Sequence, residues 1–310
     1  MRPALLAGAL VCTVLVGCGP ADESRRSEAP VGGPCPVRPI EVVATVDQWG
    51  IIAEQLAGSC AHVTSIVSGG GVDPHDYEPT PADAAALAKA DVILLNGVGY
   101  DAWAQRSIDA MTTRPIVVDI GGTWDLPAGA DPHLWYEPGV VTRSADRITE
   151  VLTAASPEAA EFFAARAAEF DTSMTPYLDL IGQIRGAVSA SPNTPVSVAA
   201  TEPVFDGMIL PLGLVDATPA GYVRAVSIGG DPSPGDIAAF MDALADGSVS
   251  VLIVNAQSSS SMTDRLREQA EAHHVPIVEV TETVAPGASS FAQWQIEQLR
   301  ALAAAVGVQL

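Results

Sequence analysis

Residues 72–103, VDPHDYEPTPADAAALAKADVILLNGVGYDAW, carry the pattern that decides the fold. Within this stretch, PADAAALAKA (81–90) has the composition of a helix. DVILLN (91–96) is short and aliphatic, which is typical of a buried strand, and another helical stretch opens near Trp103. Helices that alternate with short buried strands predict an α/β fold with a parallel sheet.

The same alternation extends outward from this stretch in both directions. It stops between Thr142 and Ser189, where the sequence is rich in Ala, Glu and Arg and has no strand pattern. We therefore predict two α/β lobes with parallel-type sheets, joined by a long rigid backbone helix. The further predicted strands are IEVVAT (40–45), VTSIV (63–67), PIVVDI (115–120), PVSVAA (195–200), LVDAT (214–218), SVLIVNA (250–256) and VPIVEVT (275–281).

The boundaries of the lobes follow from the strand-free region. One helix is predicted from Thr142 to about Ala155. Ser156-Pro157-Glu158 then has the pattern of a new helix start, and this second helix extends to Val188 with a kink expected at Pro176. The predicted organisation is an N-terminal lobe, a connecting helix and a C-terminal lobe, at residues 38–155, 156–188 and 189–310.

The N-terminus has the features of an export signal. Arg2 is followed by an apolar run from Ala4 to Val16, which is shorter than a membrane-spanning helix needs. The run ends in Leu15-Val16-Gly17-Cys18, which looks like a bacterial lipobox. We predict a signal peptide at 1–17, a lipid on Cys18 and a flexible tether at 18–37, so that the protein is extracytoplasmic and anchored to the membrane. The alternative is an ordinary signal peptide with an unmodified cysteine.

Two cysteines remain for the folded part in an oxidising compartment. Cys35 and Cys60 each precede a predicted strand, and the starts of parallel neighbouring strands lie side by side. We predict a Cys35–Cys60 disulfide, the alternative being two free thiols.

The net charge of −22, with Lys89 as the single lysine, excludes the basic patch that nucleic-acid binding requires. An acidic surface fits a cationic ligand, and it equally serves solubility.

Two histidines share one tripeptide context. His75 and His133 each follow Asp-Pro in a loop after a predicted strand. Proline restricts the backbone, and the preceding aspartate can accept a hydrogen bond from the imidazole, as partners of metal-bound histidines do. Taken alone, each would be interpreted as a surface or capping residue.

Two glutamates occupy the corresponding places in the second half. Glu202 follows PVSVAA, and Glu282 follows VPIVEV. Because ligand sites in open α/β sheets lie beyond the carboxyl ends of the strands, the two glutamates can meet the two histidines in a cleft between the lobes. Two imidazoles and two carboxylates suit Zn²⁺, Mn²⁺ or Fe²⁺. The histidines His62, His273 and His274 are interpreted as surface residues.

Three segments resemble the metal-ion (cluster A-I) solute-binding proteins of ABC transporters. They are residues 72–103, ADPHLWYEP (130–138) and the stretch from Asn255 to Val284. The resemblance implies two lobes joined by a rigid helix with the metal between them. It implies His75 and His133 as ligands, and a third ligand that TEPVF (201–205) supplies in its glutamate form.

The fourth ligand in the family is usually an aspartate, whereas this chain has Glu282 in VTETV. The nearby Glu279 is a rival, but its place on an extended strand directs it to the opposite side. The resemblance also bears on the metal, because many zinc-specific members of the family carry a long His-rich loop that this chain lacks. The absence of this loop and the His₂Glu₂ set favour manganese, whereas the general affinity order favours zinc, so the transported metal, Zn²⁺ or Mn²⁺, stays open. Binding is expected to weaken below about pH 6, where protons compete for histidine.

These features predict the binding component of an ABC importer, acting as a monomer that delivers its metal to a membrane permease. Two alternatives remain. A surface adhesin or metal-buffering lipoprotein would share the fold. A secreted metal-dependent hydrolase would need an open metal position and a catalytic motif, and the sequence has neither G-x-S-x-G nor H-E-x-x-H. We therefore expect no enzymatic activity.

Overall fold

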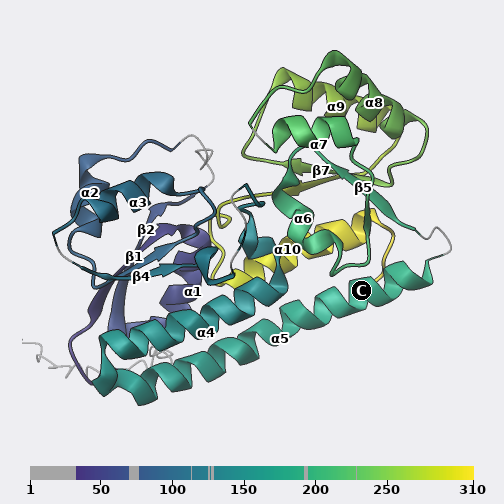
Figure 1. Cartoon of the computed structure of the whole chain (residues 1–310). Helices are drawn as coiled ribbons and strands as arrows, with labels where there is room; N and C mark the ends of the chain where they lie inside the picture. Colours follow the sequence, from purple (N-terminus) through teal and green to yellow (C-terminus); the bar gives the residue numbers. More distant parts are fainter. Residues whose placement is uncertain are drawn as a thin grey trace, which may run out of the picture.

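The computed structural model describes residues 33–69, 77–112, 114–124, 126, 129–191, 195–227 and 229–310. Two α/β lobes stand side by side above a layer of long helices (Figure 1). This arrangement confirms the predicted fold class of two parallel-sheet lobes and a long helix.

The first lobe contains a four-stranded parallel sheet in the order β2-β1-β3-β4. Its strands are short and mostly aliphatic, as sheets covered on both faces require. The strands are β1 (Ile40–Val46), β2 (Ala61–Val67), β3 (Val92–Leu95) and β4 (Ile116–Asp119), and the helices between them are α1 (Asp47–Ala57), α2 (Pro81–Leu87) and α3 (Ala102–Asp109).

The second lobe repeats this topology, with a parallel sheet in the order β6-β5-β7-β8. In both sheets the strand order reverses between the first strand of the lobe and the third, and this switch point is where α/β sheets bind ligands. The elements are β5 (Ser197–Ala200), β6 (Val215–Asp216), β7 (Val251–Asn255), β8 (Ile277–Val280), α6 (Asp206–Ile209), α7 (Ala220–Val226), α8 (Pro234–Ala245), α9 (Ser261–Ala272) and α10 (Phe291–Ala305).

Two long helices separate the strands of the first lobe from those of the second along the chain. Helix α4 spans Pro138–Ala155 and therefore begins four residues before the expected start at Thr142. Pro157 opens a single 3₁₀ turn, and α5 then runs over 31 residues, Ala160–Ala190, with Pro176 inside it. In Figure 1 α5 passes beneath both lobes, and α10 returns to lie between α5 and the sheets.

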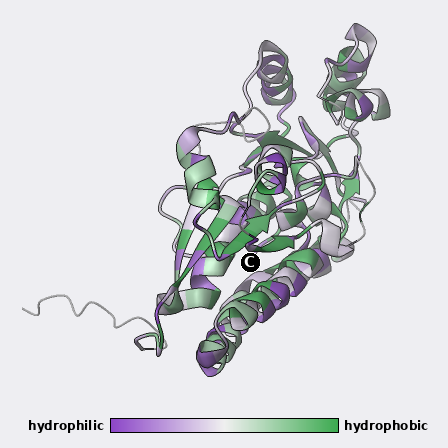
Figure 2. Cartoon of the chain, turned by 60° about the vertical axis from the view of Figure 1, so that its left-hand side comes forward, coloured by the Kyte–Doolittle hydropathy of each residue, from purple (hydrophilic) through white to green (hydrophobic). Residues whose placement is uncertain are grey.

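The hydrophobic core does not divide at the lobe boundary. One cluster of buried side chains includes Val43 and Ile93 of the first sheet, Tyr177 of α5, and Val198 and Ile253 of the second sheet. A smaller cluster around Tyr222 and Phe240 covers the other face of the second sheet. Figure 2 shows that the strands are mostly hydrophobic and that the helices carry both kinds of residue. The lobes are therefore packed together through α5 and α10.

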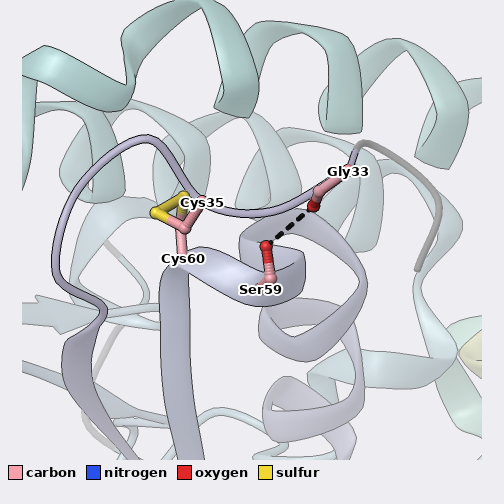
Figure 3. Close-up of a disulfide and its surroundings, with 4 residues drawn as sticks. All are labelled: Gly33, Cys35, Ser59 and Cys60. Atoms are coloured by element: carbon pink, nitrogen blue, oxygen red, sulfur yellow. Dashed lines mark hydrogen bonds between the residues drawn. A yellow bond between two sulfur atoms is a disulfide. The ribbon is translucent and has the colours of Figure 1, made fainter. Parts of the chain in front are cut away.

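Cys35, five residues before β1, and Cys60, directly before β2, form a disulfide (Figure 3). Their Cα atoms are 4.9 Å apart, and the Ser59 hydroxyl donates a hydrogen bond to the Gly33 carbonyl 3.0 Å away. This link fastens the beginning of the described chain to the amino-terminal edge of the first sheet. Within the described residues, no helix combines the length and the apolar character needed to cross a bilayer.

Candidate metal site

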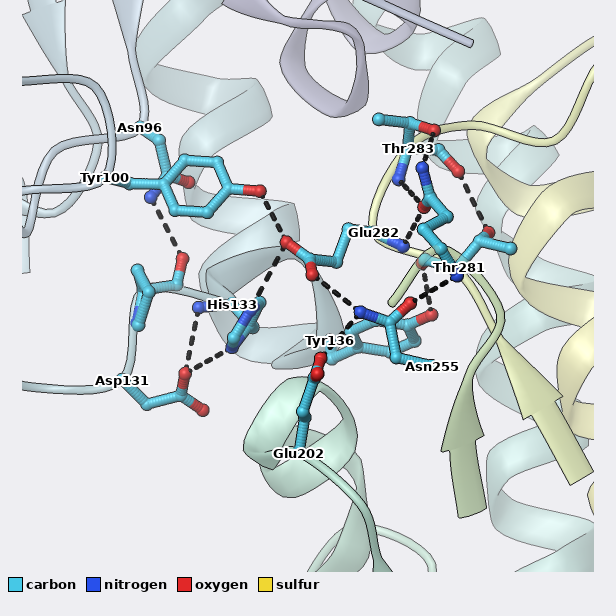
Figure 4. A network of polar contacts seen from close by, with 12 residues as sticks. Asn96, Tyr100, Asp131, His133, Tyr136, Glu202, Asn255, Thr281, Glu282 and Thr283 are labelled. Carbon is cyan, nitrogen blue, oxygen red and sulfur yellow. Dashed lines mark hydrogen bonds and ion pairs between the residues drawn. The ribbon is translucent and has the colours of Figure 1, made fainter. Parts of the chain in front are cut away.

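The candidate site lies where the carboxyl ends of both sheets face each other. A cleft of about 650 Å³ opens there, lined in the first lobe by Tyr100 and His133 and in the second by Glu202, Pro203 and Thr263. The lining residues follow β3, β4, β5 and β7, as the switch-point rule anticipates. Figure 4 shows the polar side chains that converge at this point.

His133 projects into the site from the loop between β4 and α4. Its backbone N–H and its ring Nδ1 both contact Oδ1 of Asp131, at 3.1 and 2.6 Å. The residue is 5% exposed, and its ring stands edge-on to Trp135, with the ring centroids 5.4 Å apart. This bond to Asp131 leaves Nε2 directed toward the second lobe, where it lies 3.5 Å from Oε2 of Glu282.

The surroundings of His133 change its proton affinity. Burial by itself lowers the pKa of the imidazole, but the hydrogen bonds and negative charges of Asp131 and Glu282 outweigh burial and raise the pKa to about 9. The metal-free protein therefore holds a proton on His133 at neutral pH. A cation bound by His133 in place of this proton would likewise offset the negative charges of Asp131 and Glu282.

Glu282 is fully buried near the start of the loop after β8, two residues beyond Val280. Its Oε2 accepts a hydrogen bond from the Tyr100 hydroxyl at 2.7 Å, and its Oε1 accepts one from the amide Nδ2 of Asn255 at 2.8 Å. Gln48 donates from its side-chain amide to the Glu282 carbonyl. Residues of both lobes thus orient this carboxylate.

Asn255, the last residue of β7, connects the two glutamates. The same Nδ2 that donates to Glu282 also donates to Oε2 of Glu202, at 2.7 Å (Figure 4). Glu202 itself immediately precedes the turn formed by Pro203–Phe205, at the carboxyl end of β5. A single amide nitrogen therefore brings together one carboxylate oxygen from each glutamate.

The loop that carries Glu282 is held from both sides. Gln257 accepts hydrogen bonds from the backbone N–H of Glu282 and Thr283, at 2.6 and 2.8 Å. From the first lobe, Asp47 accepts the N–H of Val284 at 3.1 Å with one carboxylate oxygen and the N–H of Gly69 at 3.1 Å with the other. Asp47 therefore fastens the loop after β8 to the segment after β2.

The structure brings together His133, Glu202 and Glu282 of the predicted set. His75 and Cys18 lie outside the described residues. In the part of the chain that the structure describes, no group of three or more His, Cys, Asp or Glu side chains has metal-binding geometry by itself. Glu279 points away from the site, since it is largely exposed and pairs with Arg267 at 2.7 Å. His62, His273 and His274 are exposed.

Sequence reasoning missed the neutral residues that orient the carboxylates, namely Tyr100, Asn255 and Gln257. The sequence contains one signal that could have identified Asn255. The strands DVILLN and SVLIVN both end in asparagine, and both asparagines are buried at the third strand of their sheet. Asn96 donates to the Pro132 carbonyl at 2.9 Å beside His133, just as Asn255 donates to the glutamates. A buried amide at the end of a strand needs such partners.

The sequence matches the family model of the zinc-uptake complex component A, periplasmic (ZnuA), over residues 42–305. The chain belongs to this family of metal-ion solute-binding proteins.

Relatives and solved structures agree with this assignment. The chain is 33% identical over 163 residues to the manganese-binding lipoprotein MntA of Halalkalibacterium halodurans, a match covering 51% of each chain. It thus spans about half the length of that relative. It is 26% identical over 257 residues to the manganese ABC transporter substrate-binding lipoprotein PsaA of Streptococcus pneumoniae, covering 77% of this chain and 78% of the relative.

The fold is similar to that of the periplasmic zinc-binding protein TroA of Treponema pallidum. The TM-score is 0.73 at 18% identity, and the match covers 87% of this chain and 100% of that one.

Proposed function

We propose that this protein captures one divalent transition metal ion, Zn²⁺ or Mn²⁺, in the cleft between its lobes and delivers it to the permease of an ABC importer. The ligands in this proposal are His75, His133, Glu202 and Glu282. The observation that carries it is the approach of His133 Nε2 to Glu282 Oε2, 3.5 Å apart, with Glu202 joined to Glu282 through Asn255. The names of the relatives support metal binding and a place in ABC import.

The donor set suits such an ion. Imidazole nitrogens and carboxylate oxygens bind both Zn²⁺ and Mn²⁺, and two ionised glutamates offset the charge of a dication. The orientation of His133 by Asp131 is the arrangement that holds a metal-bound imidazole in one tautomer. The fourth ligand, His75, is proposed from the sequence pattern alone.

The packing of the lobes bears on how the ion is released. Because one hydrophobic cluster extends from the first sheet through α5 to the second sheet, wide opening of the cleft would expose core side chains. Release therefore requires local displacement of a ligand loop, and contact with the permease would supply it.

We further propose that the organisation is that of residues 38–155, 156–188 and 189–310, and that the protein acts as a monomer outside the cytoplasm, anchored through a lipid on Cys18. A catalytic role is not part of this proposal, since four protein ligands leave no position for a reactive water. An adhesin or metal-buffering role would use the same site without a permease.

Titration of the metal-stripped protein, beginning at residue 19, with Zn²⁺ and Mn²⁺ tests the proposal. One tight site per chain, lost in both His75→Ala and Glu282→Ala, is expected. The absence of a tight site for either ion would refute the proposal. Metal uptake by cells that carry or lack the protein separates import from adhesion or buffering.

A further inference from the structure

We infer that Gly207 is a positioning residue. It lets the backbones of the two lobes touch beside the candidate ligands, and so it sets the separation of the lobes and the size of the ion that fits between them. This inference rests on the proposed function and concerns how the same site selects its ion.

Gly207 lies in α6 of the second lobe, where α6 packs against the turn Leu134–Tyr136 of the first lobe. A Cβ atom at this position would stand 3.1 Å from the carbonyl carbon of Tyr136 and 3.1 Å from the backbone nitrogen of Glu137. Favourable contacts between carbon atoms need about 3.5–4.0 Å. Glycine, which has no Cβ, therefore allows the two backbones to approach this closely.

Both sides of this contact carry a candidate ligand. His133 directly precedes the turn Leu134–Tyr136, and Glu202 directly precedes the turn Pro203–Phe205 that leads into α6. The spacing of the two backbones at Gly207 therefore bears directly on the spacing of the His133 and Glu202 side chains.

Neither side of the contact yields easily. On the α6 side, Phe205 and Met208 are buried. On the other side Tyr136 is fully buried, its ring stands edge-on to Phe205 with the centroids 5.1 Å apart, and its hydroxyl lies 2.7 Å from the side-chain oxygen of Gln298. Because protein interiors are close-packed, a methyl group added at residue 207 would be relieved by moving α6 and the turn apart by a few tenths of an ångström.

A shift of this size distinguishes metal ions. Oxygen ligands lie about 2.0–2.2 Å from Zn²⁺ and about 2.3–2.6 Å from the larger Ca²⁺, so a few tenths of an ångström separate a small divalent ion from a large one. Zn²⁺ and Cd²⁺ give the cleanest comparison, because both have filled d shells and the same charge, and Cd²⁺ is the larger. The donor atoms are the same in every variant, so a change in the ratio of the two affinities reports the spacing of the ligands.

The test measures the Kd values of Zn²⁺ and Cd²⁺ for the metal-stripped wild-type protein and for Gly207→Ala. In Gly207→Ala we expect the ratio of the Cd²⁺ Kd to the Zn²⁺ Kd to fall by about tenfold, the lower end of the loss seen when residues that orient metal ligands are changed. X-ray absorption of the Zn²⁺-loaded Gly207→Ala protein should show a longer mean distance from the ion to its ligands than in the wild type.

Gly182→Ala is the matched control, because Gly182 lies in α5 with open space at the position that its Cβ would take. This change should leave both Kd values unaltered. The wild type by itself also tests the inference, since it should bind Zn²⁺ more tightly than Cd²⁺, and this measurement stands even where Gly207→Ala fails to fold.

Equal Kd values for the two ions in the wild type, or an unchanged ratio in folded Gly207→Ala, would overturn the inference while leaving the proposed function intact. Failure of the wild-type protein to bind Zn²⁺ or Mn²⁺ would instead refute the proposed function, and the inference with it.

Discussion

The Nε2 atom of His133 and the Oε2 atom of Glu282 lie 3.5 Å apart, although one belongs to the first lobe and the other to the second. Both side chains are buried, and each is oriented by a second polar group, Asp131 for the histidine and Tyr100 for the glutamate. The lobes thus meet at a pair of candidate metal ligands, and hydrogen bonds within the protein set the orientation of both side chains.

Glu282→Gln and His133→Ala are expected to weaken Zn²⁺ and Mn²⁺ binding by more than about 100-fold, since outer partners of a metal site alone cost about 10- to 100-fold. The measurement is competitive titration with a metal indicator. Glu279→Gln and His62→Ala are the matched controls, because both residues are exposed and lie away from the cleft. Equal losses in a control and its partner variant would contradict the ligand assignment.

Metal binding should release a proton from His133. Because the pKa of this imidazole is raised to about 9, the metal-free ring is charged at pH 7, and the metal requires it neutral. The apparent affinity should therefore rise by about tenfold per pH unit up to about pH 9, rather than levelling off near pH 6 as an ordinary histidine would predict. Calorimetry in buffers of different ionisation enthalpy measures the proton. An affinity that is constant between pH 7 and 9 would contradict this expectation.

Asp47 should make the metal-free fold more stable as the pH falls from 7 to 4. Burial raises its pKa from 3.8 to about 6, so the folded state takes up a proton before the unfolded state does, and the free energy of unfolding increases by about 2 kcal/mol from this group. Asp47→Asn removes this contribution. Urea unfolding at pH 7 and pH 4 measures the free energy of unfolding of both proteins. Between pH 7 and pH 4 this free energy should increase more, or decrease less, in the wild type than in Asp47→Asn. An equal change in both proteins would contradict the role of Asp47.

Replacing the disulfide by Cys35→Ser with Cys60→Ser should lower the free energy of unfolding by about 3 kcal/mol, because the bond closes a segment of 25 residues. Denaturant unfolding checks this value. The wild-type protein in reductant is the control and should match the double variant. A double variant as stable as the oxidised protein would show that the bond does not constrain the unfolded chain.

Cys18→Ala should release the protein from the membrane fraction of the cell, since a lipid on this residue is the proposed anchor. Cys12→Ala, which changes a residue of the predicted signal peptide, should leave the protein with the membrane. Immunoblotting of separated fractions decides the matter, and lipid attachment that survives Cys18→Ala would argue for a different anchor.

The fold was predictable because its signals are local. Short aliphatic strands alternate with helices in both halves, and the absence of strands between Thr142 and Ser189 revealed the long helix. The exact start of α4 at Pro138 was missed, although proline in the first turn is itself a helix-start signal.

The site was predictable only in part. Charged ligand candidates stand out in a loop, whereas the roles of Asn255 and Gln257 depend on contacts between residues distant in sequence. Propensity and spacing carry no information about which distant carboxylate a buried amide will face. The unbroken core through α5 was likewise not evident, because apolar residues do not reveal which lobe they pack against.

The Cys35–Cys60 bond has a mechanical consequence. It joins the chain to the amino-terminal edge of the first sheet, whereas His133, Glu202 and Glu282 lie beyond the carboxyl ends of the strands. If the lipid proposed on Cys18 anchors the protein, a pull on that end of the chain would enter the described residues ahead of β1 and would be shared with β2 through the Cys35–Cys60 bond. The load would therefore pass into the side of the sheet remote from the cleft, and the candidate ligand side chains would not lie on its path.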